Sequence, residues 1–501
     1  MRTLKTRAIA AALLLSVAPA AMAAPEQAAT TAAAAGPRAP QVAVTKHAGH
    51  FNGQAVNYTA TVAEYFVNGA DSQPGASIVT IAYTRDVKDA AKRPVMFLFN
   101  GGPGASSSPL HMSALGPMRK VAADAPKDEP RWRENPYSPL DAFDLVFIDP
   151  VGTGFSRPFP GADTKAWYSR TGDAAAVTSA IEQWLKTNHR EASPRFMAGE
   201  SYGTTRAAMI LKDSKSLHFD GVALVALVGD APGREMPYVA ALPTMAAGAW
   251  YHERIDRKGR TVRQVFDETL DFARTDYVAA LIKGSSLPEA ERHRVAERMS
   301  QLVGLSVDLI ESRNLRLSKN DFMFNLLKDE GLRTGLLDMR VTAPLEPNQD
   351  GAIDDPALGV APKRAPGAPA NVKPPTPESI GAIQNPALAA YVTQDLGFKT
   401  AEPYYAVNFK VNVAWNYESG SDVNVAVGQS MAANPKMRLF WAAGLYDLTT
   451  PAYLGRYTLD QDGIPADRLT ALYFEGPHGV YDGEDNLARF DAAIRDFVMK
   501  P

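Results

Sequence analysis

The chain has 501 residues, of which 46% are hydrophobic and 21% charged, and its formal net charge is −3. This composition is typical of a globular protein and excludes a disordered chain. Acidic and basic residues are interspersed, so nothing creates the positive field that a nucleic acid or an anionic membrane would require. The sequence contains no cysteine, so a large buried core without disulfides must hold the fold.

The first residues predict an export signal. Positive charges within residues 2–7 precede an apolar run at residues 8–17 and a small-residue cleavage site that ends at Ala23. We expect cleavage after Ala23, followed by a flexible leader rich in Ala and Pro over residues 24–41. The apolar run is too short to span a bilayer, which disfavours the alternative of an N-terminal anchor. The expected location is the periplasm or the medium.

Short apolar runs flanked by turn residues predict strands from about Val42 onward. Several runs are continuous rather than alternating, as expected for strands of a parallel sheet covered on both faces. Helical patterns such as residues 173–186 lie between them and indicate a doubly wound α/β fold. The runs are residues 77–83, 94–99, 144–148, 195–198, 221–228, 438–442 and 469–474.

The regular alternation stops after residue 228. Residues 236–337 are mostly helical in pattern, with an expected capping box at Ser286 and Glu289, and residues 343–377 are rich in proline. Strand signals return only near residue 438. We therefore interpret residues 236–400 as a mainly helical cap, inserted into a catalytic domain that residues 42–235 and 401–501 form together.

A serine between two glycines follows one of the expected strands. Gly199-Glu-Ser-Tyr-Gly203 has the pattern G-x-S-x-G, with a strand run before it and a helical stretch after it. A nucleophile elbow needs small residues two before and two after the serine, because the strand-to-helix turn is too tight for side chains there. The flanking elements favour Ser201 as a nucleophile over a simple glycine turn.

A nucleophilic serine needs a base, which an acid orients, and with this elbow the chain order is Ser, Asp, His. Of the eight histidines, only His478 follows the last two strand runs. Asp447 ends the strand run that begins at Arg438, and it is the expected acid. The aspartates at positions 460, 462 and 467 remain alternatives, although position 462 looks like an ordinary turn.

A glycine-rich loop, Asn100-Gly-Gly-Pro-Gly104, follows the strand run 94–99. Backbone N–H groups in such a loop can point at developing negative charge, which predicts an oxyanion hole formed by Gly102 and Tyr202. A phosphate loop is disfavoured because G-x-x-x-x-G-K-[ST] is missing and Pro103 has no N–H. A structural turn is the other alternative. A third loop, residues 150–156, is expected to support the wall of the site.

Together these segments resemble the blocks of the serine carboxypeptidases. The resemblance implies an α/β-hydrolase fold and removal of single residues from peptide C-termini, without cofactor or metal. It also implies Ser201, Asp447 and His478 as the catalytic triad. The matching blocks, in order, are Asn100–Gly104 with Ser106-Ser107, Asn135-Pro-Tyr-Ser138, Pro150–Ser156, Gly199–Gly203 and the loops of Asp447 and His478.

By this resemblance, Asn100, Gly101 and Glu200 fall where the family binds the terminal carboxylate of the substrate. The partner would be a peptide with a free C-terminus, and neither a nucleic acid nor a membrane. An esterase or acyltransferase of the same fold, acting on small-molecule acyl groups, is the first alternative, since fold alone does not fix the substrate. A binding protein on an inactive scaffold is the non-enzymatic alternative.

The sequence departs from the family pattern at Leu98, Ala105 and Ala114, where relatives commonly have Trp, Cys and Glu. The missing glutamate matters most, because two carboxyl groups that share a proton can bind a carboxylate while one stays neutral. Without this partner for Glu200, we expect the preference for a free C-terminus to fade at a lower pH than in relatives that keep the pair.

Overall fold

The computed structural model describes residues 38–121, 132–345, 381–418 and 423–500. The expected signal at residues 1–23 and almost the whole Pro-rich stretch lie outside this part of the chain. Within the described ranges, no helix combines the length and the apolar character needed to cross a membrane.

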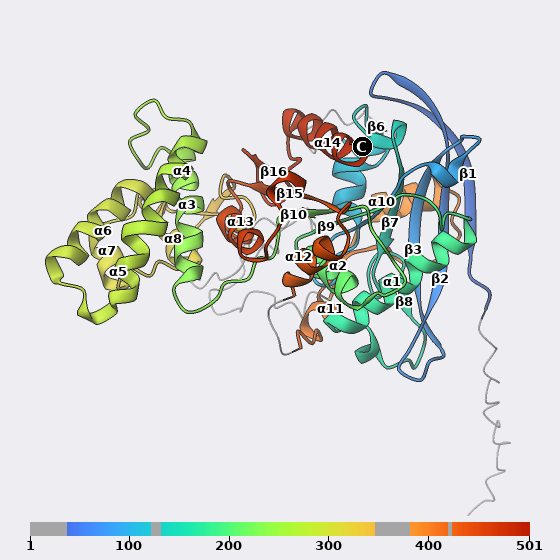
Figure 1. The fold of residues 1–501 in the computed structure, drawn as a ribbon, viewed down its shortest axis with the longest axis horizontal. Coiled ribbons are helices and arrows are strands. Elements are labelled where there is room, and N and C mark those ends of the chain that lie inside the picture. The colour runs from blue at the N-terminus through green and yellow to red at the C-terminus, as the bar shows by residue number, and fades with distance from the viewer. Residues whose placement is uncertain (1–37, 122–131, 346–380, 419–422, 501) are drawn as a thin grey trace, which may run out of the picture. The chain divides into compact units, whose positions relative to one another are not determined.

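A mostly parallel sheet forms the centre of the fold (Figure 1), and the strand order is β1-β2-β3-β7-β4-β9-β10-β15-β16. Strands β1 to β3 pair antiparallel with their neighbours, whereas every pair from β7 to β16 is parallel. The seven strands expected from the sequence are confirmed within a few residues. The strands are β1 (Val42–Phe51), β2 (Gln54–Asn68), β3 (Pro74–Arg85), β4 (Val95–Phe99), β7 (Asp144–Asp149), β9 (Arg195–Glu200), β10 (Gly221–Val225), β15 (Arg438–Gly444) and β16 (Leu469–Phe474), with β8 (Arg157–Pro158) paired to β3.

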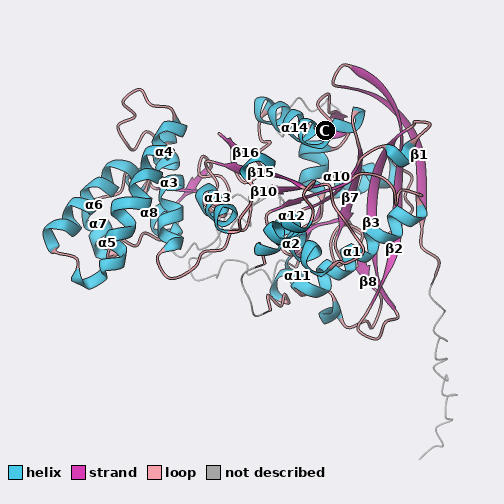
Figure 2. Cartoon of the chain, viewed as in Figure 1, coloured by secondary structure: helices cyan, strands magenta, loops and turns pink. Residues whose placement is uncertain are grey.

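Helices cover both faces of this sheet (Figure 2), which explains the continuous apolar runs. In β4, Val95, Phe97 and Phe99 pack into one hydrophobic core, whereas Met96 and Leu98 pack into another. The first core includes side chains of α1 (Arg170–Thr187), α2 (Tyr202–Asp213), α12 (Val425–Ala433) and α13 (Ala452–Gln461). The second includes α14 (Glu484–Met499) and the helical turn Leu110–Leu115. This arrangement is the α/β-hydrolase fold.

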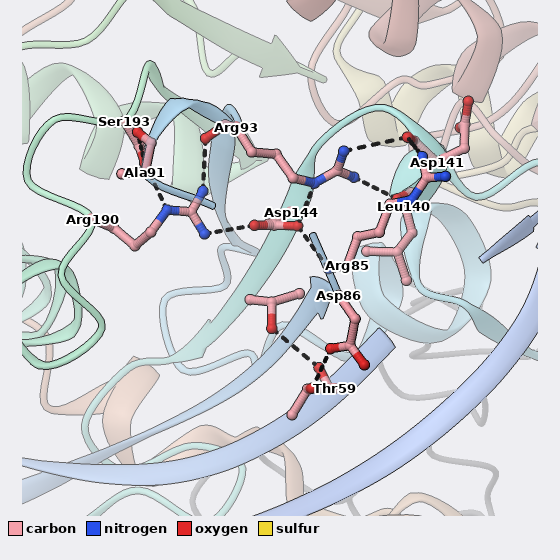
Figure 3. A network of polar contacts seen from close by, with 11 residues as sticks. Thr59, Arg85, Asp86, Ala91, Arg93, Leu140, Asp141, Asp144, Arg190 and Ser193 are labelled. Carbon is pink, nitrogen blue, oxygen red and sulfur yellow. Dashed lines mark hydrogen bonds and ion pairs between the residues drawn. The ribbon is translucent and has the colours of Figure 1, made fainter. Parts of the chain in front are cut away.

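A buried ionic network lies at the start of the parallel strands (Figure 3). Asp144, the first residue of β7, is 1% exposed and accepts hydrogen bonds from Arg93 Nε at 2.7 Å and Arg190 Nη1 at 2.6 Å. It also accepts one from the Arg85 backbone N–H at 3.0 Å. The network joins β3, β7 and the segments that enter β4 and β9. Because these are the amino ends of the strands, the network supports the edge opposite the loops discussed below.

The helices between β10 and β11 form one group, yellow-green in Figure 1. Helix α3 of this group packs against α13. Helix α5 ends at Lys283, and Gly284 caps its C-terminus with a φ of 54°. The expected capping box is wrong: Ser286 donates its hydroxyl to the Lys283 carbonyl instead, and α6 begins after Pro288. The group contains α3 (Met236–Tyr251), α4 (Val262–Phe272), α5 (Val278–Lys283), α6 (Glu289–Val303), α7 (Val307–Ser312) and α8 (Lys319–Asn325).

The end of the expected insertion, residues 381–400, packs on the sheet rather than on the cap helices. The Tyr391 and Tyr83 hydroxyls are hydrogen bonded at 3.2 Å, and Phe398 packs against Phe155. Apolar side chains of this segment belong to the second core, and the bounds of the insertion, residues 236–400, stay a prediction. The short pairs outside the main sheet are β5 (Met118–Lys120) with β6 (Trp132–Glu134), β11 (Leu332–Thr334) with β12 (Thr342–Pro344), and β13 (Ala382–Gln384) with β14 (Tyr405–Asn408).

Candidate active site

Ser201 occupies a sharp turn between β9 and α2. Its φ is 58° and its ψ is −130°, a conformation that non-glycine residues rarely adopt and that concentrates at functional sites. A Cβ atom on Gly199 would lie 2.2 Å from the Gly203 carbonyl oxygen, and one on Gly203 would lie 2.7 Å from the Phe99 carbonyl oxygen. Only glycine fits at these two positions, so the turn requires the small residues of the sequence pattern.

Asp447 and His478 meet at the carboxyl ends of β15 and β16. The His478 Nδ1 and Asp447 Oδ2 atoms are 2.7 Å apart, and both side chains are buried. Since β9, β15 and β16 belong to the same parallel set, their following loops lie at the same edge of the sheet. Of the alternative acids, Asp460 forms a surface ion pair with Arg456 instead.

The Asp447 carboxylate is held by a turn that immediately follows it. Oδ1 accepts the backbone N–H groups of Thr449 at 2.8 Å and Thr450 at 3.2 Å. Oδ2 accepts the Thr450 hydroxyl at 2.5 Å, in addition to its contact with His478. A carboxylate with this many donors is held in one position, so it can orient an imidazole and stabilise an imidazolium.

The glycine-rich loop after β4 lies directly against the elbow. A Cβ atom on Gly101 would lie 2.3 Å from the Tyr202 backbone nitrogen, so only a glycine lets the loop approach this N–H. Gly102 is exposed, with a φ of 100°. Two N–H groups near an exposed turn, those of Gly102 and Tyr202, suit the stabilisation of a developing oxyanion.

Segments distant in the sequence anchor this loop. The Ser106 N–H donates to the Ala406 carbonyl at 2.9 Å, so β14 supports the loop from one side. The Asp149 Oδ1 atom accepts both the N–H of Ser107 at 2.8 Å and its hydroxyl at 2.7 Å. Asp149 is the last residue of β7 and directly precedes the third loop, residues 150–156, which was expected to support the site.

Arg206 connects the glycine-rich loop to the helix that follows the nucleophile. Its guanidinium is fully buried, forms an ion pair with Asp173 at 2.6 Å and donates from Nη1 to the Asn100 carbonyl at 2.6 Å. The same group lies over the rings of Phe99 and Tyr202. Bonds of this kind are charge-assisted and strong, so Arg206 fixes Asn100 relative to α2.

Glu200 is buried next to the nucleophile and beside two polar side chains. Its Oε2 atom accepts the Tyr481 hydroxyl at 2.7 Å, and the Asn100 side chain contributes a further hydrogen bond. The Asn100 Oδ1 atom accepts the Leu110 N–H at 3.1 Å, which leaves the amide NH₂ of Asn100 to face the site. Asn100 and Glu200, which the family resemblance assigns to carboxylate binding, therefore lie together.

Burial raises the pKa of Glu200 to about 7, although the charge of His478 and the hydrogen bond from Tyr481 lower it. Burial thus favours the neutral carboxyl without a second glutamate beside it, and the pH dependence expected from Ala114 stays a prediction. Ala114 itself is fully buried in the second core. The proton on Glu200 should therefore persist to near-neutral pH.

Sequence reasoning missed Tyr481, Arg206 and Thr450. Tyr481 lies three residues after His478, and Thr450 three residues after Asp447, so proximity to the expected triad was the only available signal. Among the described residues, no group of three or more His, Asp or Glu side chains could hold a metal ion.

Part of the chain matches a family of known proteins. Its model, "Serine carboxypeptidase", matches residues 82–260. Serine carboxypeptidase-like 21 of Arabidopsis thaliana is 29% identical over 141 residues, 27% of this chain and 28% of that protein. Serine carboxypeptidase 1 of Hordeum vulgare is 30% identical over 120 residues, 23% of each chain. The pheromone-processing carboxypeptidase KEX1 of Podospora anserina is 36% identical over 118 residues, 23% of this chain and 18% of that protein.

The matched region spans less than a third of the length of each of these relatives. The match to the family model, residues 82–260, contains the glycine-rich loop and Ser201, whereas Asp447 and His478 lie outside it. Among solved structures, the esterase RhEst1 from Rhodococcus sp. ECU1013 aligns with 15% identity and a TM-score of 0.37, over 87% of this chain and 98% of its own. Residues 82–260 of this chain are thus similar to the serine carboxypeptidases, and they lie within an α/β-hydrolase fold.

Proposed function

We propose that this protein is a serine carboxypeptidase that releases C-terminal amino acids from peptides. The observation that carries the proposal is the buried Glu200, placed directly before the nucleophile and hydrogen bonded to Tyr481. A neutral carboxyl group there can donate a hydrogen bond to a substrate carboxylate. An esterase for uncharged acyl groups has no use for such a donor.

In the proposed mechanism, the Ser201 hydroxyl attacks the carbonyl carbon of the last peptide bond while His478 takes its proton. The N–H groups of Gly102 and Tyr202 stabilise the oxyanion of the tetrahedral intermediate. His478 then returns the proton to the leaving amine, which departs as a free amino acid and leaves an acyl-enzyme on Ser201. Water, activated by His478, hydrolyses this ester, and Asp447 stabilises the imidazolium in both steps.

The terminal carboxylate of the substrate would be held by three groups. Asn100 supplies amide hydrogens, Gly101 supplies a backbone N–H, and Glu200 supplies a hydroxyl while it carries its proton. Above its pKa, Glu200 becomes an anion that repels the substrate carboxylate. The proposed preference for a free C-terminus is therefore present at acidic pH and is lost as the pH rises through about 7.

A peptide with a free C-terminus should react faster than its C-terminal amide, by roughly ten- to a hundredfold in kcat/KM at mildly acidic pH. The amide removes the charge for which the buried donors are arranged, and such mismatches cost on the order of 1–3 kcal/mol. The measurement compares matched N-blocked dipeptide acids and amides from mildly acidic to alkaline pH. The ratio should fall as Glu200 ionises near pH 7.

Two variants sharpen this test. Asn100→Ala should reduce the ratio of kcat/KM for the acid to kcat/KM for the amide, because it removes one hydrogen-bond donor to the substrate carboxylate. Tyr481→Phe removes a hydrogen bond that lowers the pKa of Glu200, so the midpoint of the pH dependence should move to higher pH. Equal rates on acid and amide at every pH would contradict the exopeptidase proposal, and rapid cleavage of a matching small ester would then favour the esterase or acyltransferase.

We also propose that the protein is exported and processed after Ala23. The intact mass of the protein recovered from the periplasm or the medium should correspond to a chain that begins at residue 24. A full-length mass in a membrane fraction would contradict this and support the anchor instead.

A further inference from the structure

A lysine of the helical insertion reaches the turn that holds the expected catalytic acid. Lys319 is the first residue of α8, which begins with a capping box between Ser318 and Asp321. Its side chain is half-buried, and Nζ donates to the Thr449 carbonyl oxygen at 2.6 Å. A lysine gives up hydration when it is buried, so this contact must compensate for a real cost.

The contact continues to Asp447 through a single peptide group. The Thr449 carbonyl accepts the ammonium group, and the N–H at the other end of the same peptide, that of Thr450, donates to Asp447 Oδ1 at 3.2 Å. Hydrogen bonds at the two ends of one amide polarise it in the same direction and strengthen each other. The positive charge of Lys319 thus strengthens the donor that holds the carboxylate.

Electrostatics links the same groups directly. Burial lowers the pKa of Lys319, and the charge of Asp447 opposes this by raising it. On the other side, the charges of Glu200 on β9 and His478 act on one another. Lys319 and Glu200 are thus titratable groups from two different elements that face the Asp447 and His478 pair.

The insertion also holds both triad loops by its backbone. The N–H of His478 donates to the Leu337 carbonyl at 2.8 Å, and the N–H of Leu448 donates to the Leu336 carbonyl at 2.9 Å. The N–H of Met339 donates to the Tyr446 carbonyl at 3.0 Å. Together with the contact of Lys319, these bonds connect the insertion to both loops at several points.

We propose that Lys319 is a positioning residue of the triad, whose ammonium group fixes the Asp447 turn and, through it, the imidazole of His478. This inference rests on the proposed triad. It assigns to the insertion a part in the chemistry, beyond any part in shaping the substrate pocket.

The test measures how fast a fluorophosphonate labels Ser201 in the full-length protein across pH, because this reaction requires the triad but no peptide specificity. Lys319→Met should slow labelling roughly ten- to a hundredfold, the effect expected from a small misplacement of the base. It should also move the acidic limb of the pH profile to higher pH, since removing a nearby cation favours the imidazolium. With a peptide substrate, kcat should fall while KM changes little.

Three further variants separate the causes. Lys319→Arg keeps the charge, so its labelling rate should be close to that of the wild type. Lys319→Gln keeps a hydrogen-bond donor without the charge. Its labelling rate should be lower than that of the Arg variant, and its pH profile should show the same shift as that of Lys319→Met. Lys328→Met removes an exposed lysine from the turn Lys328–Glu330 and should behave as wild type. If Lys319→Met does not fold, the comparison of the Arg and Gln variants decides instead.

Unchanged labelling of Lys319→Met at every pH would overturn the inference. A loss of rate that matches a loss of thermal stability, without a pH shift and without rescue by Arg, would also overturn it and leave a packing role. Failure of the wild-type protein to label at Ser201 would overturn the proposed triad itself, which is a different result.

Discussion

Replacing Ser201 by alanine should abolish turnover and fluorophosphonate labelling while leaving the fold intact. Loss of a triad nucleophile costs roughly a millionfold in kcat, because the acyl-enzyme can no longer form. The Cβ atom remains, so the turn keeps the backbone conformation that Ser201 already adopts at a φ of 58°. The measurement is peptide turnover, with circular dichroism and thermal melting to show that the variant is folded.

The matched control for this variant is Ser285→Ala. Ser285 is an exposed serine in the turn Gly284–Ser286 of the insertion, far along the chain from the elbow. Its loss should change neither turnover nor labelling. If Ser201→Ala retained activity with unchanged labelling, the nucleophile would lie elsewhere and the elbow would be only a structural turn.

The sequence predicted the sheet well because its strands are buried on both faces. A strand such as β4 shows five consecutive apolar residues, a pattern that needs no partner to be recognised. The first two strands of the sheet, β1 and β2, were not among the predicted runs. In β1, exposed and partly buried residues alternate along an edge, and residues such as Lys46 and His47 interrupt any apolar run.

Local patterns could not predict the contacts that complete the candidate site. The hydrogen bond between Tyr481 and Glu200 joins residues 281 positions apart, and the one between Lys319 and Thr449 joins residues 130 positions apart. Nothing in the sequence near either residue indicates its partner. The place of residues 381–400 was equally hard to predict, because they contribute separate apolar side chains to the second core rather than one continuous apolar run.

The expectation drawn from Ala114 shows a related limit. A missing partner glutamate is visible in the sequence, whereas the degree to which Glu200 is buried is not. Burial raises the pKa of a carboxyl group by itself, so two different environments can keep Glu200 protonated. A residue that departs from a family pattern therefore predicts a changed property only if no other part of the fold provides the original property.

His478→Ala should reduce kcat nearly as much as Ser201→Ala, and the double variant should be no worse than either single one. Nucleophile and base act as one unit, so removal of either ends the same step. His478 is held by Asp447 through Nδ1 at 2.7 Å, so the nitrogen that takes the proton in the proposed mechanism is Nε2. His293→Ala, which changes an exposed histidine of the insertion, is the control and should remain active. The contrary result would be near wild-type activity of His478→Ala, together with loss of activity in His293→Ala or in another histidine variant of the insertion. The base would then come from the cap. The chain order used to select His478 would not apply to this protein.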